Sequence, residues 1–192
     1  MLSDEEYNRW CARLNLSPEA IKVIDHIRSS PPARRVRSGP FNVSEIFNQS
    51  LKMPHSIQSE SRTVESAAIR INEKDNDVLE IWDQPPSFTI NYKGTNGRTL
   101  GHLYTADFFL LRRNRAGWEE WKPEEALLLL AKKSPNRYLL GSDGKWRCPP
   151  CEEYAAPLGL YFEIHSSSEI NTVLQRNLHL LWPVIRAEFG EA

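Results

Sequence analysis

Cysteine is scarce in this chain, and long hydrophobic runs are missing. Only three cysteines occur among 192 residues, an odd number that argues against a disulfide framework and fits a reducing compartment. No apolar run approaches the roughly 18 residues that a membrane span needs. The acidic start, Ser3-Asp4-Glu5-Glu6, does not resemble a signal peptide. We therefore expect a cytoplasmic protein.

The chain also lacks an excess of charge of either sign, with a formal net charge of −1. This balance is unusual for a protein that grips nucleic acid alone, although short basic clusters can contact phosphates. Two such clusters are Arg34, Arg35 and Arg37, and Arg112, Arg113 and Arg115, for which plain solvated surface is the competing interpretation. A glycine-rich phosphate loop and a Gly-x-Ser-x-Gly motif are both missing, so nucleotide hydrolysis and serine hydrolase chemistry have little support.

The composition fits one globular domain with a small appendage. Apolar residues make up 40% and charged residues 26% of the chain, and this length is enough for a real core. Residues 3–28 carry two helical patterns, the second beginning at Ser17 with Pro18 behind it. We place a boundary near residue 38, which separates a helical N-terminal segment with an Arg/Pro-rich linker (1–38) from the main domain (39–192).

In the main domain, helical and strand patterns follow one another. Val64, Ala67, Ala68 and Ile71 have helical spacing, which predicts a helix from Ser59 onward. Strands are expected at 78–82 and 88–92 and through 102 to 107, with Asn96-Gly97 as a hairpin turn. A helix after Pro123, a small hairpin at 138–147, a short helix at 152–158, a strand at 160–164 and a last helix from 166 to 181 follow. This order predicts an α/β fold in which helices sandwich a mixed sheet.

The most informative stretch is residues 104–122. Asp107 precedes a four-residue apolar run, 108–111, that predicts a buried strand, and a turn is expected at 114–117. The next strand carries Glu120 and Lys122, which share a face while Trp121 points away, because side chains alternate along a strand. If the two strands pair as a hairpin in matching parity, Asp107 joins that face.

Two carboxylates and one ammonium at the end of a hairpin have a chemical use. Carboxylate oxygens are ligands that Mg²⁺ prefers, and a metal held by them can activate water and stabilise charge on a phosphate. A lysine beside them can orient the water or neutralise the same charge. Glu65 lies next to the apolar stripe of the first predicted helix, within reach of such a site, and Glu60 is a weaker candidate. The competing interpretation is a set of ordinary surface charges, because an Asp…Glu-x-Lys pattern often arises by chance.

A known family shares these features in the same order. They are Glu65, Gln84-Pro85-Pro86, Tyr104-Thr105-Ala106-Asp107-Phe108, Glu120-Trp121-Lys122 and Ser168-Glu169-Ile170-Asn171. The series resembles the N-terminal catalytic domain of TnsA endonucleases, which are PD-(D/E)xK nucleases of the restriction-endonuclease-like superfamily. The resemblance covers about residues 59–182. No single motif is specific, but their order and spacing together are.

The resemblance implies a fold, a reaction and partners. It implies a restriction-endonuclease-like mixed sheet and a DNA endonuclease that uses Mg²⁺, with Mn²⁺ as an alternative ion. Glu65, Asp107 and Glu120 would hold the metal, and Lys122 would complete the site. TnsA proteins cut the 5′ ends of transposon DNA, while a DDE-type partner, TnsB, cuts and joins the 3′ ends and an ATPase regulates the complex. A stand-alone restriction or repair nuclease and a non-catalytic interaction subunit remain as alternatives.

Three departures from the family pattern bear on these expectations. Ala106 stands where such nucleases often have proline, and Trp121 is bulkier than usual and must fit the opposite face of its strand. The chain ends soon after the last predicted helix, so the C-terminal domain through which relatives bind their ATPase regulator is not represented, and the N-terminal helices are the expected substitute.

Two further parts of the sequence carry residue types that metal sites or catalysis use. Cys148-Pro149-Pro150-Cys151 offers two zinc ligands, and the further candidates, Cys11 and His165, are distant from it in sequence. Structural zinc sites normally take four ligands in tight local spacing. We therefore do not expect zinc. His102 precedes Asp107 on the same predicted strand, and we expect a structural role for it.

Overall fold

The computed structural model describes residues 1–33, 45–47, 50–59, 64–94, 97–171, 173, 176–177 and 180–181. The chain begins with two helices, α1 (Asp4–Arg13) and α2 (Pro18–Ser29), as the sequence predicted. Each helix starts at a serine, Ser3 or Ser17, whose side chain accepts a hydrogen bond from a first-turn N–H. No helix within the described ranges has the length and apolarity that crossing a bilayer requires.

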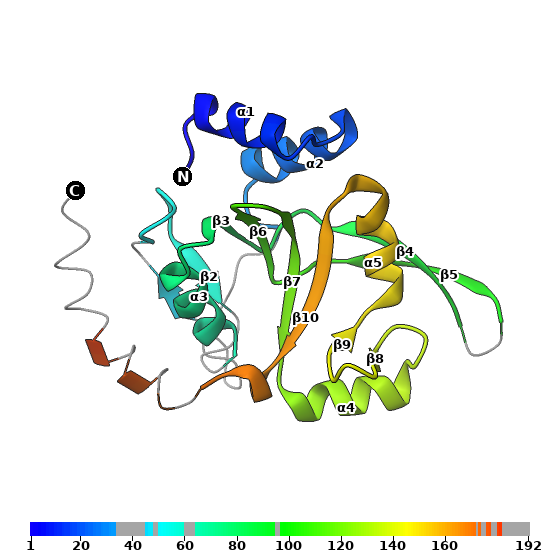
Figure 1. Ribbon diagram of the computed structural model, residues 1–192. Helices are drawn as coiled ribbons and strands as arrows, with labels where there is room; N and C mark the ends of the chain where they lie inside the picture. The colour runs from blue at the N-terminus through cyan, green and yellow to red at the C-terminus, as the bar shows by residue number, and fades with distance from the viewer. Residues whose placement is uncertain are drawn as a thin grey trace.

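A mixed four-stranded sheet forms the centre of the molecule (Figure 1). Its strands, in spatial order, are β10 (Tyr161–Ser166), β7 (Ala116–Lys122), β6 (Phe108–Arg112) and β3 (Val78–Asp83). β3, β6 and β7 pair antiparallel, whereas β10 is parallel to β7. Helix α3 (Glu65–Lys74) lies on one side of the sheet and α5 (Pro149–Ala155) on the other. This is the predicted restriction-endonuclease-like arrangement.

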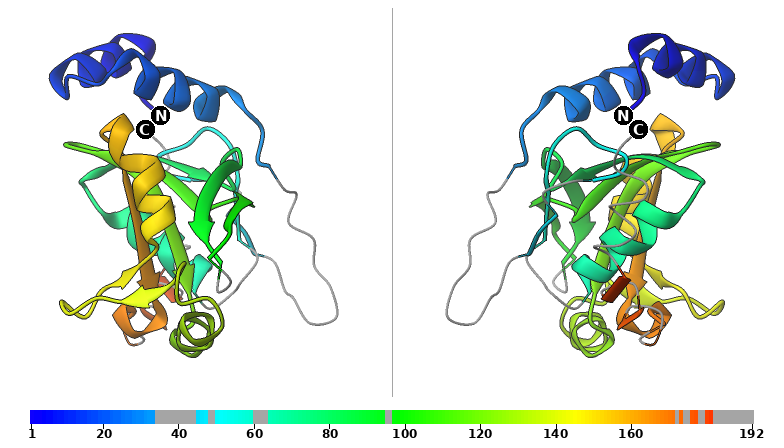
Figure 2. Two further views of the ribbon diagram at one scale, coloured as in Figure 1. Left: turned by 90° about the vertical axis from the view of Figure 1, so that its right-hand side faces the viewer. Right: turned by 90° about the vertical axis from the view of Figure 1, so that its left-hand side faces the viewer.

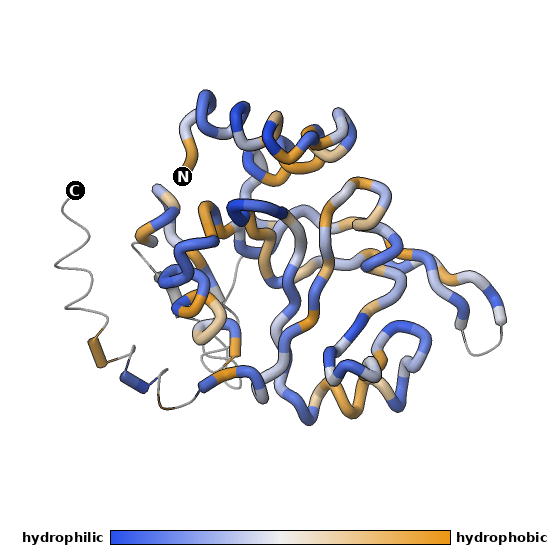
Figure 3. Tube along the Cα trace, in the orientation of Figure 1, coloured by the Kyte–Doolittle hydropathy of each residue, from blue (hydrophilic) through white to orange (hydrophobic). Residues whose placement is uncertain are grey.

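Smaller elements surround this sheet. β4 (Phe88–Lys93) and β5 (Thr99–Tyr104) pair as a two-stranded ribbon that projects from the body (Figures 1 and 2). The others are β1 (Glu45–Phe47) and β2 (Ile57–Ser59), α4 (Glu124–Lys133), β8 (Leu139–Leu140) and β9 (Trp146–Arg147), and the 3₁₀ turns η1 (Ala156–Leu158) and η2 (Ser167–Glu169). Along α4, Leu127 is buried but Leu128 and Leu129 are exposed, and Figure 3 shows this helix as a hydrophobic stretch at the surface.

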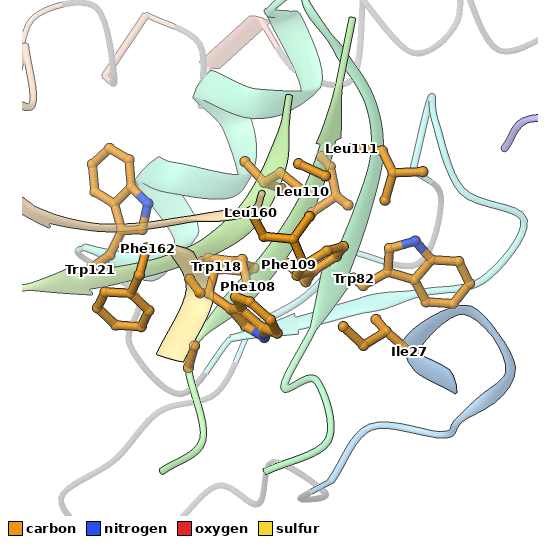
Figure 4. Packing of buried hydrophobic residues seen from close by; sticks show 14 of the residues in the cluster. Ile27, Trp82, Phe108, Phe109, Leu110, Leu111, Trp118, Trp121, Leu160 and Phe162 are labelled. Carbon is orange, nitrogen blue, oxygen red and sulfur yellow. The ribbon is translucent and has the colours of Figure 1, made fainter. Parts of the chain in front are cut away.

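The core lies on both faces of β6 and β7, where residues 108–111 and Trp118 are buried (Figure 4). Phe88 anchors the ribbon to this core: its ring centroid lies 4.3 Å from that of Tyr154 on α5 and 5.1 Å from that of Trp118 on β7. Burying one such aromatic side chain contributes about 1.5–3 kcal/mol. The base of the ribbon is therefore fixed on the same sheet face as Trp118.

The two N-terminal helices pack against strands β3 and β6 of the central sheet. The indole N–H of Trp10 donates to the carbonyl of Arg112 at 2.8 Å. The Arg28 guanidinium donates to both carboxylate oxygens of Glu80 at 3.0 and 3.1 Å, and the Glu80 side chain is wholly buried. Ile27 of α2 lies beside Trp82 of β3 (Figure 4). The helices thus complete one hydrophobic cluster with the sheet, while the expected boundary near residue 38 lies outside the described residues.

Several predicted boundaries were wrong. Ala116 and Gly117 belong to β7 rather than to a turn. Gly117 is a glycine for reasons of packing, because a Cβ there would lie 2.1 Å from the Tyr161 carbonyl oxygen on β10. Ser59 ends β2 instead of starting a helix, and β5 stops at Tyr104. Helix α5 begins earlier than predicted, at Pro149, where the first turn needs no backbone donor. The predicted last helix does not begin at Ser166, which ends β10, and the 3₁₀ turn η2 (Ser167–Glu169) follows. Residues 172, 174–175 and 178–179 of that prediction lie outside the described residues.

Candidate active site at the ends of β6 and β7

The register of the β6–β7 hairpin brings the predicted residues together. Phe108 pairs with Glu119, so Asp107, one residue before β6, lies across from Glu120 on the same face. The Trp121 backbone N–H donates to Asp107 Oδ2 at 2.8 Å, which holds that carboxylate in place. Glu120 Oε1 and Lys122 Nζ form an ion pair. The matching parity that the sequence argument required is therefore present.

Electrostatics show that this site is crowded with negative charge. Burial and the nearby Glu120 raise the pKa of Asp107 well above its usual range, and Lys122 and the Trp121 N–H act in the other direction. Burial by itself would lower the pKa of Lys122, but the charges of Glu120 and Asp107 more than offset this and raise it. The ammonium is therefore held in its charged form between two carboxylates.

Glu65 approaches the same cluster from a distant part of the chain. It is the first residue of α3 and is partly exposed. Its negative charge contributes to the raised pKa of Asp107, which shows that the two carboxylates are near enough to interact. Glu60 and the linker arginines Arg34, Arg35 and Arg37 lie outside the described residues.

One oxygen of Glu120 provides a test of whether these residues suit a cation. Glu120 is only 4% exposed, and its Oε2 is buried without a hydrogen-bond partner in the part of the chain that the structure describes. A buried acceptor left unpaired is costly. A divalent cation among carboxylate oxygens would satisfy it, and an all-oxygen donor set is the one that Mg²⁺ prefers.

Four residues to which the sequence assigned no role at this site interact electrostatically with Glu120. Burial and the charge of Glu120 raise the pKa of Tyr104 and of Tyr138. Cys148 and Cys151 are fully buried, their sulfur atoms lie 2.9 Å apart, and the Glu120 charge also raises the pKa of Cys151, after burial as the main cause. Only the alternation of β5, which sends Tyr104 inward, could have indicated any of them.

The opposite face of β7 carries a second acidic group. Atoms of Glu119, Glu163 and His165 lie within 4.8 Å of one another, close enough to hold a metal. However, Arg112 donates to Glu119 at 2.8 Å, and Arg115 donates to both oxygens of Glu163 at 2.5 and 3.1 Å. The negative charge of this group is thus already compensated by arginine.

Trp121 and His165 complete this second group. The Trp121 ring stacks on the His165 ring, with centroids 4.5 Å apart, and its indole N–H donates to Glu119 at 3.2 Å. The bulky residue between Glu120 and Lys122 therefore fits the opposite face, as expected. His165 also hydrogen-bonds Glu169 at 2.7 Å, and among the described residues it is not grouped with the cysteine pair.

Sheet topology and the acidic hairpin end together place this protein in the restriction-endonuclease-like class. Residues 75–167 match the family described as TnsA-like endonuclease N terminal. This segment, just under half of the chain, is similar to that family, and the match indicates a nuclease of the transposition type, a class that works on DNA with a transposase partner. The match includes Asp107, Glu120 and Lys122 but not Glu65. No curated protein matches the chain.

Proposed function

We propose that this protein is a Mg²⁺-dependent DNA endonuclease that serves as the TnsA-like subunit of a heteromeric transposase. It cleaves the 5′ ends of a transposon, while a DDE-type, TnsB-like partner acts on the 3′ ends and an ATPase regulates the complex. The observation that carries this proposal is the cluster of Asp107, Glu120 and Lys122, in which Glu120 is buried and has a carboxylate oxygen without a partner among the described residues.

Each side chain has a distinct part in this proposal. Glu65, Asp107 and Glu120 would hold the ion, with Mn²⁺ as an alternative to Mg²⁺. When bound, the ion supplies a Lewis acid that stabilises negative charge on the scissile phosphate. The Trp121 N–H keeps Asp107 in one orientation. Lys122, held as an ammonium, neutralises charge on the phosphate or orients the attacking water.

The net charge near zero bears on how DNA is selected. Phosphate contacts supply much of the affinity of DNA-binding proteins, and this chain has a formal net charge of −1. We therefore expect the isolated chain to bind DNA weakly, with strong salt dependence and little sequence preference. Directed cleavage is expected only when the DDE partner is present.

Strand-specific cleavage of DNA that contains a transposon end tests the proposal. The chain is assayed with and without the DDE partner, in Mg²⁺ and in chelator, and 5′-strand breaks are counted with end-labelled strands. Asp107→Ala should abolish metal-dependent cleavage while keeping the fold and the partner complex. Glu125→Ala removes an exposed carboxylate from α4 and serves as the matched control with full activity.

Three results would contradict the proposal in different ways. Undiminished cleavage by the Asp107 variant would place the active site elsewhere. Efficient site-specific cutting by the chain alone would favour a stand-alone restriction or repair nuclease. If the assembled complex cuts only the 3′ strands, the chain is a non-catalytic interaction subunit.

A further inference from the structure

The β4–β5 ribbon lies in the longest stretch of the chain that is free of acidic residues. The chain has 25 Asp and Glu residues, yet none occurs from Gln84 to Ala106. The basic side chains of this stretch are Lys93, Arg98 and His102. A second acid-free stretch, residues 126–142, covers most of α4 and the loop that follows it. Because acids are absent from them, both stretches carry a net positive charge in a chain that is close to neutral as a whole.

Strand pairing gives the ribbon two different faces. The inner face carries Phe88 and Tyr104, which pack on the sheet. The outer face consists of exposed residues that are mostly small and polar: Thr89, Asn91, Lys93, Thr99, Gly101 and Leu103. Lys93 Nζ donates to Thr99 Oγ1 across the strands at 2.8 Å. This outer face therefore presents hydrogen-bonding groups and a cation, without an acid to repel a phosphate.

The ribbon is also connected to the candidate active site. At its base, the Ser87 and Thr105 hydroxyls form a hydrogen bond of 2.6 Å, two residues before Asp107. Near its tip, the Asn136 amide donates to the carbonyl of Lys93 at 2.6 Å. The ribbon and the loop after α4 thus form one surface that borders the carboxylate cluster.

Arg137, on the same loop, adds a second connection. Its guanidinium lies 5.3 Å from the ring centroid of Tyr92 on β4 and 5.9 Å from that of Tyr104 at the end of β5. Arg137 therefore joins the loop after α4 to both strands of the ribbon, whose base lies next to Asp107.

We propose that the outer face of the β4–β5 ribbon is a DNA-contacting surface that positions the scissile strand at Asp107. This inference rests on the proposed endonuclease function and names the part of the chain that meets the substrate. A two-stranded ribbon fits the major groove of B-DNA. Lys93 and Arg98 contact phosphates, and Gly101, which has no side chain, lets the DNA approach the backbone closely. Leu103, 68% exposed, meets base or sugar edges.

Equilibrium binding to a fluorescent duplex provides the test, with the full chain at low salt and in chelator so that no cleavage occurs. Lys93→Ala/Arg98→Ala removes two cations from the ribbon, and Arg9→Ala/Lys22→Ala removes two exposed cations from α1 and α2. Each lost phosphate contact should make the negative slope of log K (the association constant) against log salt shallower by about 0.9. It should also weaken binding at about 50 mM salt by roughly tenfold. The control pair should keep the wild-type slope.

A second pair of variants separates charge from bulk. At Gly101 an added Cβ would meet Asn91 Oδ1 at 3.6 Å and Thr89 Cγ2 at 3.9 Å, which are ordinary contacts, so substitution should preserve the fold. Gly101→Glu and Gly101→Gln have nearly equal volume. The glutamate variant should bind DNA at least about tenfold more weakly than the glutamine variant, because it places an anion where phosphates approach. Thermal unfolding verifies that both are folded.

The outcomes distinguish a failure of this inference from a failure of the endonuclease proposal on which it rests. Ribbon variants that bind DNA like the control pair would overturn the inference, and so would a wild-type chain that binds no duplex at low salt. Ribbon variants that bind DNA normally but no longer join the DDE partner would also overturn it, since the ribbon would then be a protein-docking surface. In each case, cleavage by the wild-type complex and its loss in Asp107→Ala would leave the endonuclease proposal standing.

Discussion

Replacing Asp107 by asparagine should make the metal-free protein more stable and abolish its response to Mg²⁺. Burial and the neighbouring Glu120 raise the pKa of Asp107 in the fold. A carboxyl group whose pKa is raised by folding has no destabilising effect below its unfolded-state pKa of about 3.9, because it is protonated in both states. Above its folded-state pKa it is ionised in both states, and its destabilising effect on the fold is complete. The gain from removing its charge should therefore be measured at neutral or alkaline pH, in chelator.

The expected size follows from the charges in the site. Two like charges 4 Å apart repel by about 4 kcal/mol at an effective dielectric constant of about 20. Lys122 offsets much of this repulsion, because it is paired with Glu120 and also interacts with Asp107. Asparagine can still accept the hydrogen bond from the Trp121 N–H. We expect the free energy of unfolding to rise by about 1–2 kcal/mol.

Adding Mg²⁺ should reverse this order. An ion that binds only the folded state stabilises it by about 2.7 kcal/mol at a concentration of about 100 times its Kd. Urea unfolding of both proteins, in chelator and across a Mg²⁺ titration, measures the two effects. The variant should be more stable without metal, and the wild type should draw level or overtake it with metal. Equal stability in chelator together with equal Mg²⁺ responses would refute the carboxylate-site argument.

Three further outcomes can be checked by unfolding experiments. Gly117→Ala should lower the free energy of unfolding by about 3 kcal/mol, because its Cβ would lie 2.1 Å from a β10 carbonyl oxygen. Gly141→Ala is the control: there the closest atom, at 2.5 Å, is a flexible carboxylate oxygen, and the loss should be under about 0.5 kcal/mol. Arg28→Met should cost about 3 kcal/mol because it leaves the buried carboxylate of Glu80 without its cation. Burial opposes protonation of His165, but the nearby carboxylates of Glu163 and Glu169 outweigh it and raise its pKa from 6.5 to about 9. Protonated His165 therefore stabilises the fold fully below pH 6.5, and this stabilisation is lost as the pH rises through about 9. His165→Gln should remove this pH dependence from the free energy of unfolding measured across the range.

The hairpin could be predicted from sequence because its signal is local. An apolar run after Asp107 and the alternation at Glu120 and Lys122 fix which face each side chain takes, and the antiparallel register confirmed that parity. Gly117 was misassigned for the opposite reason. Its neighbour is Tyr161, and a single sequence carries no sign that these two positions meet.

The same limit applies to the N-terminal helices and the ribbon. Helical spacing and the Ser17-Pro18 start predicted the two helices well, but nothing local revealed that Trp10 and Arg28 would pack on the sheet. The Asn96-Gly97 turn indicated a hairpin, and the paired strands β4 and β5 confirmed it. That this hairpin leaves the central sheet and projects outward depends on the packing of Phe88, which sequence periodicity does not record.

Adjacent acids on β7 show how a candidate site can be distinguished from a structural ion-pair group. Glu119 is wholly buried and receives hydrogen bonds from Arg112, Tyr161 and Trp121, so its charge is needed for the fold and is already balanced. Glu120, one residue further and on the other face, has a single cation, Lys122, and a buried oxygen without a partner in the described part of the chain. The sequence favoured Glu120 through its spacing to Lys122 and its parity with Asp107, but it did not show that the charge of Glu119 is balanced within the fold. Because buried polar groups are normally satisfied by the fold itself, the unsatisfied one is where a ligand from outside the chain is expected, and this is the glutamate that shares its face with Asp107.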